Sequence, residues 1–243
     1  MTIVYREIET IVIDEIHLIG EKGRGQVLES ILARYKDRIN IKRLIGLSAT
    51  LENAEEFAGW LNARLLKPPE NWSPNTLHKE VISYEYDDEN QPWDSEHERQ
   101  KIILLKQLVN NIEKNKRQKG PVIIFCQSKK KCINRALTIA SWKDSNESES
   151  SKVNSDFTDI TDQDFEYLIK NRVGFHFSNN RFKGKFFNLF KGKKLDYLFA
   201  TTGLAEGLNL PCRNVIILDT MVGMNELDIN KAEQMLGRAG REY

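Results

Sequence analysis

The chain has 243 residues, of which 40% are hydrophobic and 29% charged, a composition typical of a globular protein with one large domain or two smaller ones. The net charge of +1 excludes a globally basic protein, so a polyanionic partner would require a local basic surface. No apolar stretch approaches the ~20 residues that a membrane-spanning helix needs, and the first residues are not patterned as a secretory signal.

Residues 1–66 are predicted to form part of an α/β domain. We expect strands at Thr10–Ile13 and Lys42–Leu47 and helices at Gln26–Tyr35 and Asn53–Leu61. The apolar runs within both strands predict burial on both faces of a parallel sheet. Prolines then interrupt the periodicity, so the next residues, 67–77, are predicted to be a linker that crosses between two lobes.

Residues 78–243 are predicted to form a second α/β lobe. We expect strands at His78–Tyr86, Pro121–Phe125, Val173–Phe177, Leu195–Ala200 and Asn214–Leu218. Helices are expected at Glu96–Lys116, Lys129–Ser141 (with Ser128 as its N-cap), Gln163–Lys170, Phe182–Phe190 and Lys231–Leu236. The polar stretch Lys143–Asp156 is predicted to be a mobile surface loop. This alternation of strands and helices favours a parallel sheet with helices on both faces.

An acidic pair, Asp14 and Glu15, directly follows the first predicted strand, and His17 lies two residues further on. The crevice at the carboxyl ends of parallel strands is where α/β proteins hold their ligands. Acidic groups at that position suit a hydrated Mg²⁺ and an attacking water, which is the chemistry of nucleotide hydrolysis. For the pair taken alone, a solvated acidic turn is the alternative.

Four further motifs follow this pair along the chain. They are Ser48-Ala49-Thr50, the strand end Val122–Ser128, the stretch Phe199–Pro211 and the segment Gln234–Arg241. In order and spacing the five motifs resemble motifs II to VI of the superfamily-two helicases. The most similar branch is the DExH superkiller-like group, with archaeal DNA-repair helicases and RNA helicases of the exosome and spliceosome. The stretches Asp14–Tyr35 and Gly46–Ala63 are characteristic of that branch.

The resemblance implies two RecA-like P-loop NTPase lobes with parallel sheets. Residues 1–66 would be the C-terminal half of the first, ATP-binding lobe, which is therefore incomplete, and residues 78–243 would be the second. No Gly-x-x-x-x-Gly-Lys-Ser/Thr motif occurs, and the family continues past Arg241 into further domains. We therefore expect a fragment of a longer helicase, inactive alone, whose partners include the missing P-loop and C-terminal segments.

The resemblance also assigns roles around ATP. Asp14 would hold Mg²⁺ through its water shell, and Glu15 would polarise the attacking water. His17, Ser48 and Thr50 would couple hydrolysis to lobe movement, although both hydroxyl residues also fit a strand-end turn. From the second lobe, the residues implied to act on the nucleotide are the arginine fingers Arg238 and Arg241, together with Gln234, Gly207, Asn209 and Gly237.

A second set of residues is implied to bind nucleic acid. Thr201, Thr202 and Gly203 would grip one phosphate, and Ser128 and Lys129, at a helix start, would hold another. A solvated surface position is an equal alternative for Lys129.

Two segments depart from the sequence pattern of the branch. Within Phe175–Asn179 only His176 matches its His-His-Ala-Gly element, and the segment Asp219–Asn230 is short for its strand-separating hairpin, with Met221, Met224, Leu227 and Ile229 as candidate wedge residues.

These assignments predict part of an ATP-dependent helicase or translocase that uses ATP and Mg²⁺ and moves on single-stranded or tailed DNA or RNA, with further protein partners left open. Two alternatives stay open: a non-catalytic nucleic-acid-binding or partner-docking module, and a nucleotide-gated switch that moves along a duplex. The chain has three cysteines, an odd number whose spacing fits no zinc site, so we expect reduced thiols and a cytoplasmic (or, in a eukaryote, nuclear) protein without a membrane partner.

Overall fold

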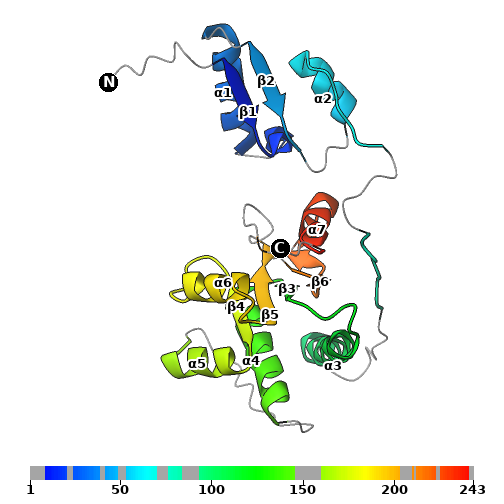
Figure 1. Cartoon of the computed structure of the whole chain (residues 1–243), viewed down its shortest axis with the longest axis vertical. Helices are drawn as coiled ribbons and strands as arrows, with labels where there is room; N and C mark the ends of the chain where they lie inside the picture. The colour runs from blue at the N-terminus through cyan, green and yellow to red at the C-terminus, as the bar shows by residue number, and fades with distance from the viewer. Residues whose placement is uncertain are drawn as a thin grey trace. The chain divides into compact units, whose positions relative to one another are not determined.

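The computed structural model describes residues 9–20, 24–38, 42–48, 53–69, 76–83, 93–145, 160–202, 210, 212–222 and 225–240. The chain forms two compact units, Met1–Trp72 and Ser73–Tyr243. Both are mixed α/β units with parallel strands, as predicted, and Figure 1 labels their main helices and strands. None of the described helices is long and apolar enough to cross a membrane.

The first unit contains a small parallel sheet. Its elements are β1 (Thr10–Ile13), a 3-10 turn η1 (Ile16–Gly20), α1 (Arg24–Arg38), β2 (Arg43–Gly46) and α2 (Ala54–Leu61). β1 pairs with β2 in parallel, with Thr10 opposite Arg43 and Ile13 opposite Gly46. The two strands and two helices expected here are therefore confirmed, and η1 is the element that periodicity did not predict because its five residues are too few to show a repeat.

The prediction that β1 and β2 are buried on both faces is wrong for the described residues. Exposed and half-buried positions alternate along β1, where Val12 is 57% exposed and its neighbours Ile11 and Ile13 are half-buried. Ile45 and Leu47 are exposed in and after β2. Alternation of this kind marks a sheet with one covered face, and the described part of this unit places no element over the other face.

The second unit contains a sheet of four parallel strands. Its elements are α3 (Trp93–Lys114), β3 (Val122–Cys126), α4 (Lys129–Ser145), α5 (Asp162–Lys170), β4 (Val173–His176), α6 (Lys183–Lys191), β5 (Tyr197–Thr201), β6 (Asn214–Ile217), β7 (Met221–Val222), β8 (Asn225–Glu226) and α7 (Ile229–Leu236). The strand order is β4-β5-β3-β6, and β7 and β8 form a separate antiparallel hairpin. α4 packs against β3, β4 and β5, α6 against β4 and α7 against β6.

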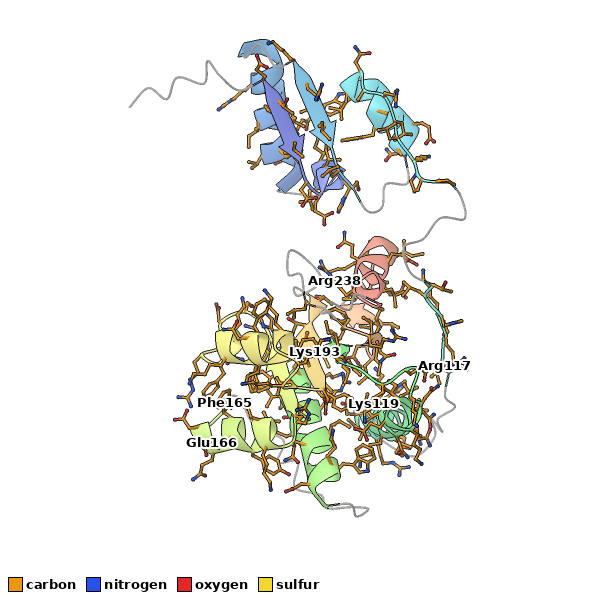
Figure 2. The ribbon with its side chains drawn as sticks, in the orientation of Figure 1. Arg117, Lys119, Phe165, Glu166, Lys193 and Arg238 are labelled. Atoms are coloured by element: carbon orange, nitrogen blue, oxygen red, sulfur yellow. The ribbon has the colours of Figure 1, made fainter. Side chains whose placement is uncertain are left out.

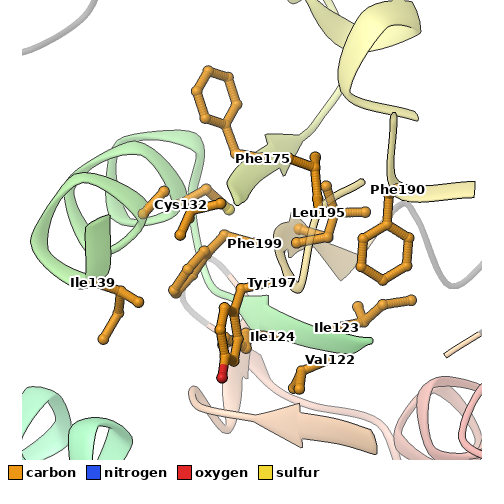
Figure 3. Close-up of a cluster of buried hydrophobic side chains, with 14 of the residues drawn as sticks. Val122, Ile123, Ile124, Cys132, Ile139, Phe175, Phe190, Leu195, Tyr197 and Phe199 are labelled. Carbon is orange, nitrogen blue, oxygen red and sulfur yellow. The ribbon is translucent and has the colours of Figure 1, made fainter. Parts of the chain in front are cut away.

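β3 is the centre of the hydrophobic core. All five of its residues are buried, as a run without polar residues predicts for a strand covered on both faces. Figure 3 shows Val122, Ile123 and Ile124 of β3 among Phe175 of β4, Tyr197 and Phe199 of β5 and Cys132 and Ile139 of α4. Leu105 and Val109 of α3 belong to the same cluster. Burial of this apolar surface, at ~25 cal/mol per Å², fixes the sheet and hence the loops at its carboxyl edge.

The strand predicted at His78–Tyr86 is wrong for its described residues. Residues 76–83 are exposed, Val81 is 97% exposed, and none of them is in a helix or a sheet. Apolar alternation suggested a strand, but in the described structure no neighbouring strand pairs with this segment. Lys79 of this segment donates from Nζ to Glu233 of α7 at 2.8 Å, in an exposed ion pair. The predicted loop Lys143–Asp156 begins later than expected, since α4 continues to Ser145, and residues 146–156 lie outside the described part.

Two glycines of the second unit give a matched test of this packing. A Cβ on Gly174 of β4 would lie 2.7 Å from Phe186 Cδ1 and 2.8 Å from Leu195 Cδ1, whereas a Cβ on Gly184 of α6 would meet nothing within 4 Å. We expect Gly174→Ala to lower the free energy of unfolding by about 1–3 kcal/mol through overpacking. Gly184→Ala is expected to raise it by up to about 1 kcal/mol through helix propensity. Urea denaturation measures both, and equal effects of the two variants would contradict the close approach at β4.

Candidate functional site

The turn after β1 holds the acidic pair of the first unit. The Leu47 amide donates to the Ile13 carbonyl at 2.8 Å and the Ile16 amide donates to the Leu47 carbonyl at 2.9 Å, so this turn is fastened to the end of β2. Asp14 Oδ1 accepts from the Glu15 amide at 3.0 Å. Glu15 has a φ of 53°, a left-handed conformation that costs a non-glycine residue about 1 kcal/mol and recurs at functional turns. Both carboxylates are exposed at the carboxyl end of the strand.

Three of the predicted residues meet at this turn. His17 Nδ1 lies 3.0 Å from Ser48 Oγ and 3.4 Å from Glu15 Oε2. Ser48 and His17 are 31 positions apart in the chain and are brought together by the parallel pairing of β1 with β2. Both contacts use the same ring nitrogen, so the tautomer of His17 decides whether Nδ1 accepts from the Ser48 hydroxyl or donates a hydrogen bond to one of its two neighbours. Thr50, the other coupling residue, lies outside the described residues.

The chemistry of this turn fits a magnesium ion held mainly by water. Among the described residues no group of three or more His, Cys, Asp or Glu side chains is arranged to enclose a metal ion. Mg²⁺ keeps several waters and is bound in nucleotide sites by one or two carboxylates plus phosphate oxygens, so a protein cage is not needed. The exposed Asp14 carboxylate can supply the single protein contact that such an ion needs.

A second group of predicted residues lies at the carboxyl edge of the four-stranded sheet. The register pairs Cys126 of β3 with Thr201 of β5, so the loop after β3 and the pair Thr201–Thr202 follow neighbouring strand ends. Ser128 Oγ accepts from the Lys131 amide at 3.3 Å, which confirms the predicted N-cap of α4. Lys129 is exposed, and its Nζ lies 6.0 Å from the centre of the Phe177 ring. Gly203, Gly207 and Asn209 lie outside the described residues.

His176, at the end of β4 on the same edge, is a core residue. Its side chain is 4% exposed and its ring centre lies 6.1 Å from that of Phe187. Burial, together with the charge of Lys183, lowers the pKa of His176 to about 4, so the ring is neutral at pH 7. A buried neutral imidazole does not present a positive charge to phosphate. The departure from the His-His-Ala-Gly pattern therefore coincides with a histidine that serves packing.

The last predicted motif lies at the end of α7. Gln234 lies in the last turn of α7, and Arg238 follows the helix, where its amide donates to the Met235 carbonyl at 3.1 Å. The backbone continues as a tightened turn through Gly237 to Gly240, whose φ of 72° suits glycine. The Cys212 thiol donates to the Arg238 carbonyl at 2.9 Å, and the Gly240 amide donates to the Arg213 carbonyl at 3.3 Å. Figure 2 labels Arg238 at this end of α7. Arg241 lies outside the described residues.

A buried ion-pair network beside the carboxyl edge was not predicted. Asp219, which follows β6, is 5% exposed, and Arg135 of α4 is 1% exposed. Arg135 Nη1 donates to Asp219 Oδ2 at 2.5 Å and Arg135 Nη2 to Asp219 Oδ1 at 3.0 Å. A signal for it exists in the sequence, because Arg135 falls on the same helical face as the buried Cys132 and Ile139.

The hairpin expected after β6 is present but small. β7 pairs Met221 with Glu226 and Val222 with Asn225 of β8, and the Leu227 amide donates to the Thr220 carbonyl at 2.7 Å. Of the candidate wedge residues, Leu227 packs against the core, whereas Ile229 is 69% exposed. Met224 lies outside the described residues.

Comparison with known proteins gives two family matches and a set of helicase relatives. Residues 100–242 match the helicase conserved C-terminal domain, and residues 2–57 match the DEAD/DEAH box helicase domain. The chain is 34% identical over 256 residues to an ATP-dependent DNA helicase Hel308 of Methanococcus vannielii, covering 97% of this chain and 33% of that protein. ATP-dependent DNA helicases Hel308 of Thermoplasma volcanium and Pyrococcus horikoshii are each 32% identical to this chain. Each match covers 97% of this chain, together with 34% of the Thermoplasma protein and 33% of the Pyrococcus protein. The chain thus spans about a third of the length of these curated relatives.

The burial of His176 predicts a pH dependence of stability. The pKa of about 4 in the folded chain lies below the ordinary value of 6.5, so the unfolded chain binds more protons between these pH values. The stabilisation from the neutral ring is present above about pH 6.5 and is lost as the pH falls toward 4, by at most about 3 kcal/mol. Urea denaturation of the wild type and His176→Phe between pH 7 and 4.5 measures the difference. Parallel pH profiles of the two proteins would contradict it.

Proposed function

The chain belongs to the family of the helicase conserved C-terminal domain, and from this premise we propose that it is part of an ATP-driven motor that moves on a single strand of nucleic acid. The observation that carries the proposal is the contact of His17 with Ser48 and Glu15 at a strand end. A solvated acidic turn gives no reason for these three side chains to converge. The relatives are named ATP-dependent DNA helicases, which supports ATP as the nucleotide and makes DNA the first strand to test.

Hydrolysis is assigned to the turn after β1. In the proposed step the oxygen of a water molecule attacks the γ-phosphorus while Glu15 accepts a proton from that water. The bond between the γ-phosphorus and the oxygen that bridges it to the β-phosphate breaks. ADP and inorganic phosphate are the products. Asp14 would contact a hydrated Mg²⁺, which supplies neutralisation of phosphate charge when it is bound. The exposure of both carboxylates leaves them accessible to nucleotide and water.

The coupling role falls to His17, Ser48 and Thr50. Engagement of Glu15 by the attacking water would weaken its 3.4 Å contact with His17 Nδ1 and favour the contact of this nitrogen with Ser48. Because Ser48 follows β2, such a change would pass to the segment after that strand. We propose that this exchange of partners signals the state of the nucleotide to the rest of the motor.

Arg238 and Arg241 are proposed as the cationic groups that act on the same nucleotide, with Gln234, Gly207, Asn209 and Gly237 as further contacts. An arginine supplies a permanent charge and a fork of donors that matches phosphate oxygens. The hydrogen bonds from the Cys212 thiol to the Arg238 carbonyl and from the Gly240 amide to the Arg213 carbonyl fix the backbone that carries Arg238. A fixed backbone supports a role that depends on geometry.

Binding of the nucleic-acid strand is assigned to the carboxyl edge of the four-stranded sheet. Thr201, Thr202 and Gly203 would bind one phosphate, and Ser128 and Lys129 another, from the neighbouring strand end and the start of α4. The β7–β8 hairpin is small, so translocation is proposed ahead of duplex separation. All three cysteines are buried in the core of the second unit, which is consistent with the proposed cytoplasmic or nuclear setting.

The assignment of Glu15 is tested on the full-length gene product. We expect Glu15→Gln to lower the kcat of single-strand-stimulated ATP hydrolysis at least ~100-fold, since a general base contributes about 10²–10⁴. Binding of a labelled single strand should stay within about twofold, because Glu15 is assigned to hydrolysis. Glu56→Gln, on the exposed side of α2, is the control and should leave both quantities unchanged. Measuring with DNA and with RNA identifies the strand.

Two results would contradict the proposed motor function. Full activity of Glu15→Gln would remove this carboxylate from the reaction. Binding of nucleic acid without hydrolysis by the wild type would instead establish a non-catalytic binding module.

The assignment of Arg238 is tested by removing its side chain. We expect Arg238→Ala to lower kcat by about 10³, the size of effect of an arginine that stabilises phosphoryl transfer, with a smaller change in the KM for ATP. Arg238→Lys keeps the charge but loses the fork, so its kcat should fall between those of Arg238→Ala and the wild type. Arg99→Ala, which removes an exposed arginine paired with Glu96 on α3, is the control. Equal losses in both alanine variants would contradict the role.

A further inference from the structure

The Asp219 carboxylate accepts hydrogen bonds from elements that are far apart in the chain. Its Oδ1 accepts from Lys101 Nζ of α3 at 2.8 Å, and its Oδ2 accepts from the Gln127 backbone amide at 2.8 Å. Arg135 of α4 donates to both oxygens, at 2.5 and 3.0 Å. Burial raises the pKa of Asp219, but these hydrogen bonds and the charge of Arg135 outweigh it and hold the pKa well below its ordinary value. The carboxylate is therefore charged at neutral pH.

Arg135 is held in place from its other side by Glu98. Arg135 Nε donates to Glu98 Oε1 at 2.6 Å and Arg135 Nη2 donates to Glu98 Oε2 at 2.8 Å. A guanidinium that forks onto two carboxylates has little freedom to rotate, because each fork fixes its plane. α3, α4 and the end of β6 are thus joined through charged groups in addition to their apolar contacts.

The network touches a segment with a proposed role on nucleic acid and the base of the small hairpin. One is the turn Gln127–Lys129, called here the grip turn, whose first amide donates to Asp219 and whose Gln127 Oε1 accepts from Lys131 Nζ at 3.1 Å. The other is the β7–β8 hairpin, which is closed by the bond from the Leu227 amide to the carbonyl of Thr220, the residue after Asp219. One carboxylate therefore lies between the grip turn and the base of the hairpin.

We propose that Asp219, oriented by Arg135, is a positioning residue that fixes the grip turn relative to the hairpin. Asp219 is 5% exposed and does not itself contact the strand. It acts through the Gln127 amide, which sets where Ser128 and Lys129 present their hydroxyl and ammonium groups. The inference rests on the proposed phosphate contact of Ser128 and Lys129.

The sign of the effect separates positioning from simple electrostatics. Replacing Asp219 by asparagine removes a negative charge near a polyanion, so electrostatics alone predicts tighter binding of a nucleic-acid strand. Positioning predicts weaker binding, because an amide cannot hold Arg135, Lys101 and the Gln127 amide together. A fall in affinity on removal of an acidic group is thus the signature of the network.

The test measures the Kd of the full-length gene product for a fluorescein-labelled single strand of DNA, by fluorescence anisotropy over a series of salt concentrations. We expect Asp219→Asn to raise the Kd roughly fivefold and to reduce the slope of log K against log salt by about 0.7, the value of one single-strand phosphate contact. Asp196→Asn is the matched control. Asp196 also accepts a forked pair from an arginine, Arg172, at 2.8 Å and 2.8 Å, but it precedes β5 at the opposite end of that strand. The Kd of Asp196→Asn for the labelled DNA strand should stay within about twofold of the wild-type value.

A double-mutant cycle with Lys129→Ala separates the inference from the function on which it rests. If Asp219 acts through the grip turn, the effects of Asp219→Asn and Lys129→Ala on binding are not additive. Additive effects, or an unchanged Kd in Asp219→Asn while Lys129→Ala weakens binding, overturn the positioning role and leave the phosphate contact standing. An unchanged Kd in Lys129→Ala overturns the phosphate contact, and the inference falls with it.

A second variant keeps the test decisive if Asp219→Asn does not fold. Glu98→Gln changes the half-exposed end of the network, keeps the size of the side chain and also removes a negative charge. We expect it to raise the Kd at least ~threefold, beyond the range allowed for the control, at a temperature where thermal unfolding shows a folded protein, again opposite to electrostatics alone. A Kd equal to or below that of the wild type overturns the inference.

Discussion

The parallel pairing of β3 with β5 and β6 is the constraint on which the second unit depends. Its register sets Cys126 beside Thr201 and Phe125 beside Ile217, so the loops that follow all leave from one edge. The pairing holds because the five residues of β3 are apolar and fully buried between helices. The polar residues that begin at Gln127 therefore follow the buried strand at this edge, and the register places Ser128 and Lys129 near Thr201.

The same kind of apolar strand behaves differently in the first unit, which shows what an apolar run determines. Ile11, Val12 and Ile13 predict a strand as clearly as β3 does, yet Val12 is 57% exposed. An apolar run determines the extended conformation, because β-branched side chains favour it. Which faces are buried depends on the elements packed against the strand, and these belong to other parts of the polypeptide.

Most elements of both units could be predicted from periodicity, and the failures have physical causes. Helices such as α4 and strands such as β3 have their own pattern, so local sequence is sufficient. The segment 76–83 has strand-like alternation but no partner among the described strands, and pairing is not encoded locally. The acidic turn of Asp14 and Glu15 was found because its motif is contiguous. Arg135 and Asp219 were missed as a pair because they are 84 residues apart and neither belongs to a motif.

A buried ion pair such as Arg135–Asp219 needs an explanation other than stability. Removing two charges from water costs several kcal/mol each, and well-packed apolar residues of similar volume are often at least as stabilising. Apolar residues, however, would leave the Gln127 amide without its acceptor, and they pack without a preferred direction. The carboxylate specifies one orientation for each donor, so it fixes the start of α4 relative to the end of β6 more narrowly than hydrophobic contact does. The proposed phosphate contacts of Ser128 and Lys129 would need that kind of directional constraint, and the charged network lies where it could supply it, at the end of the apolar core.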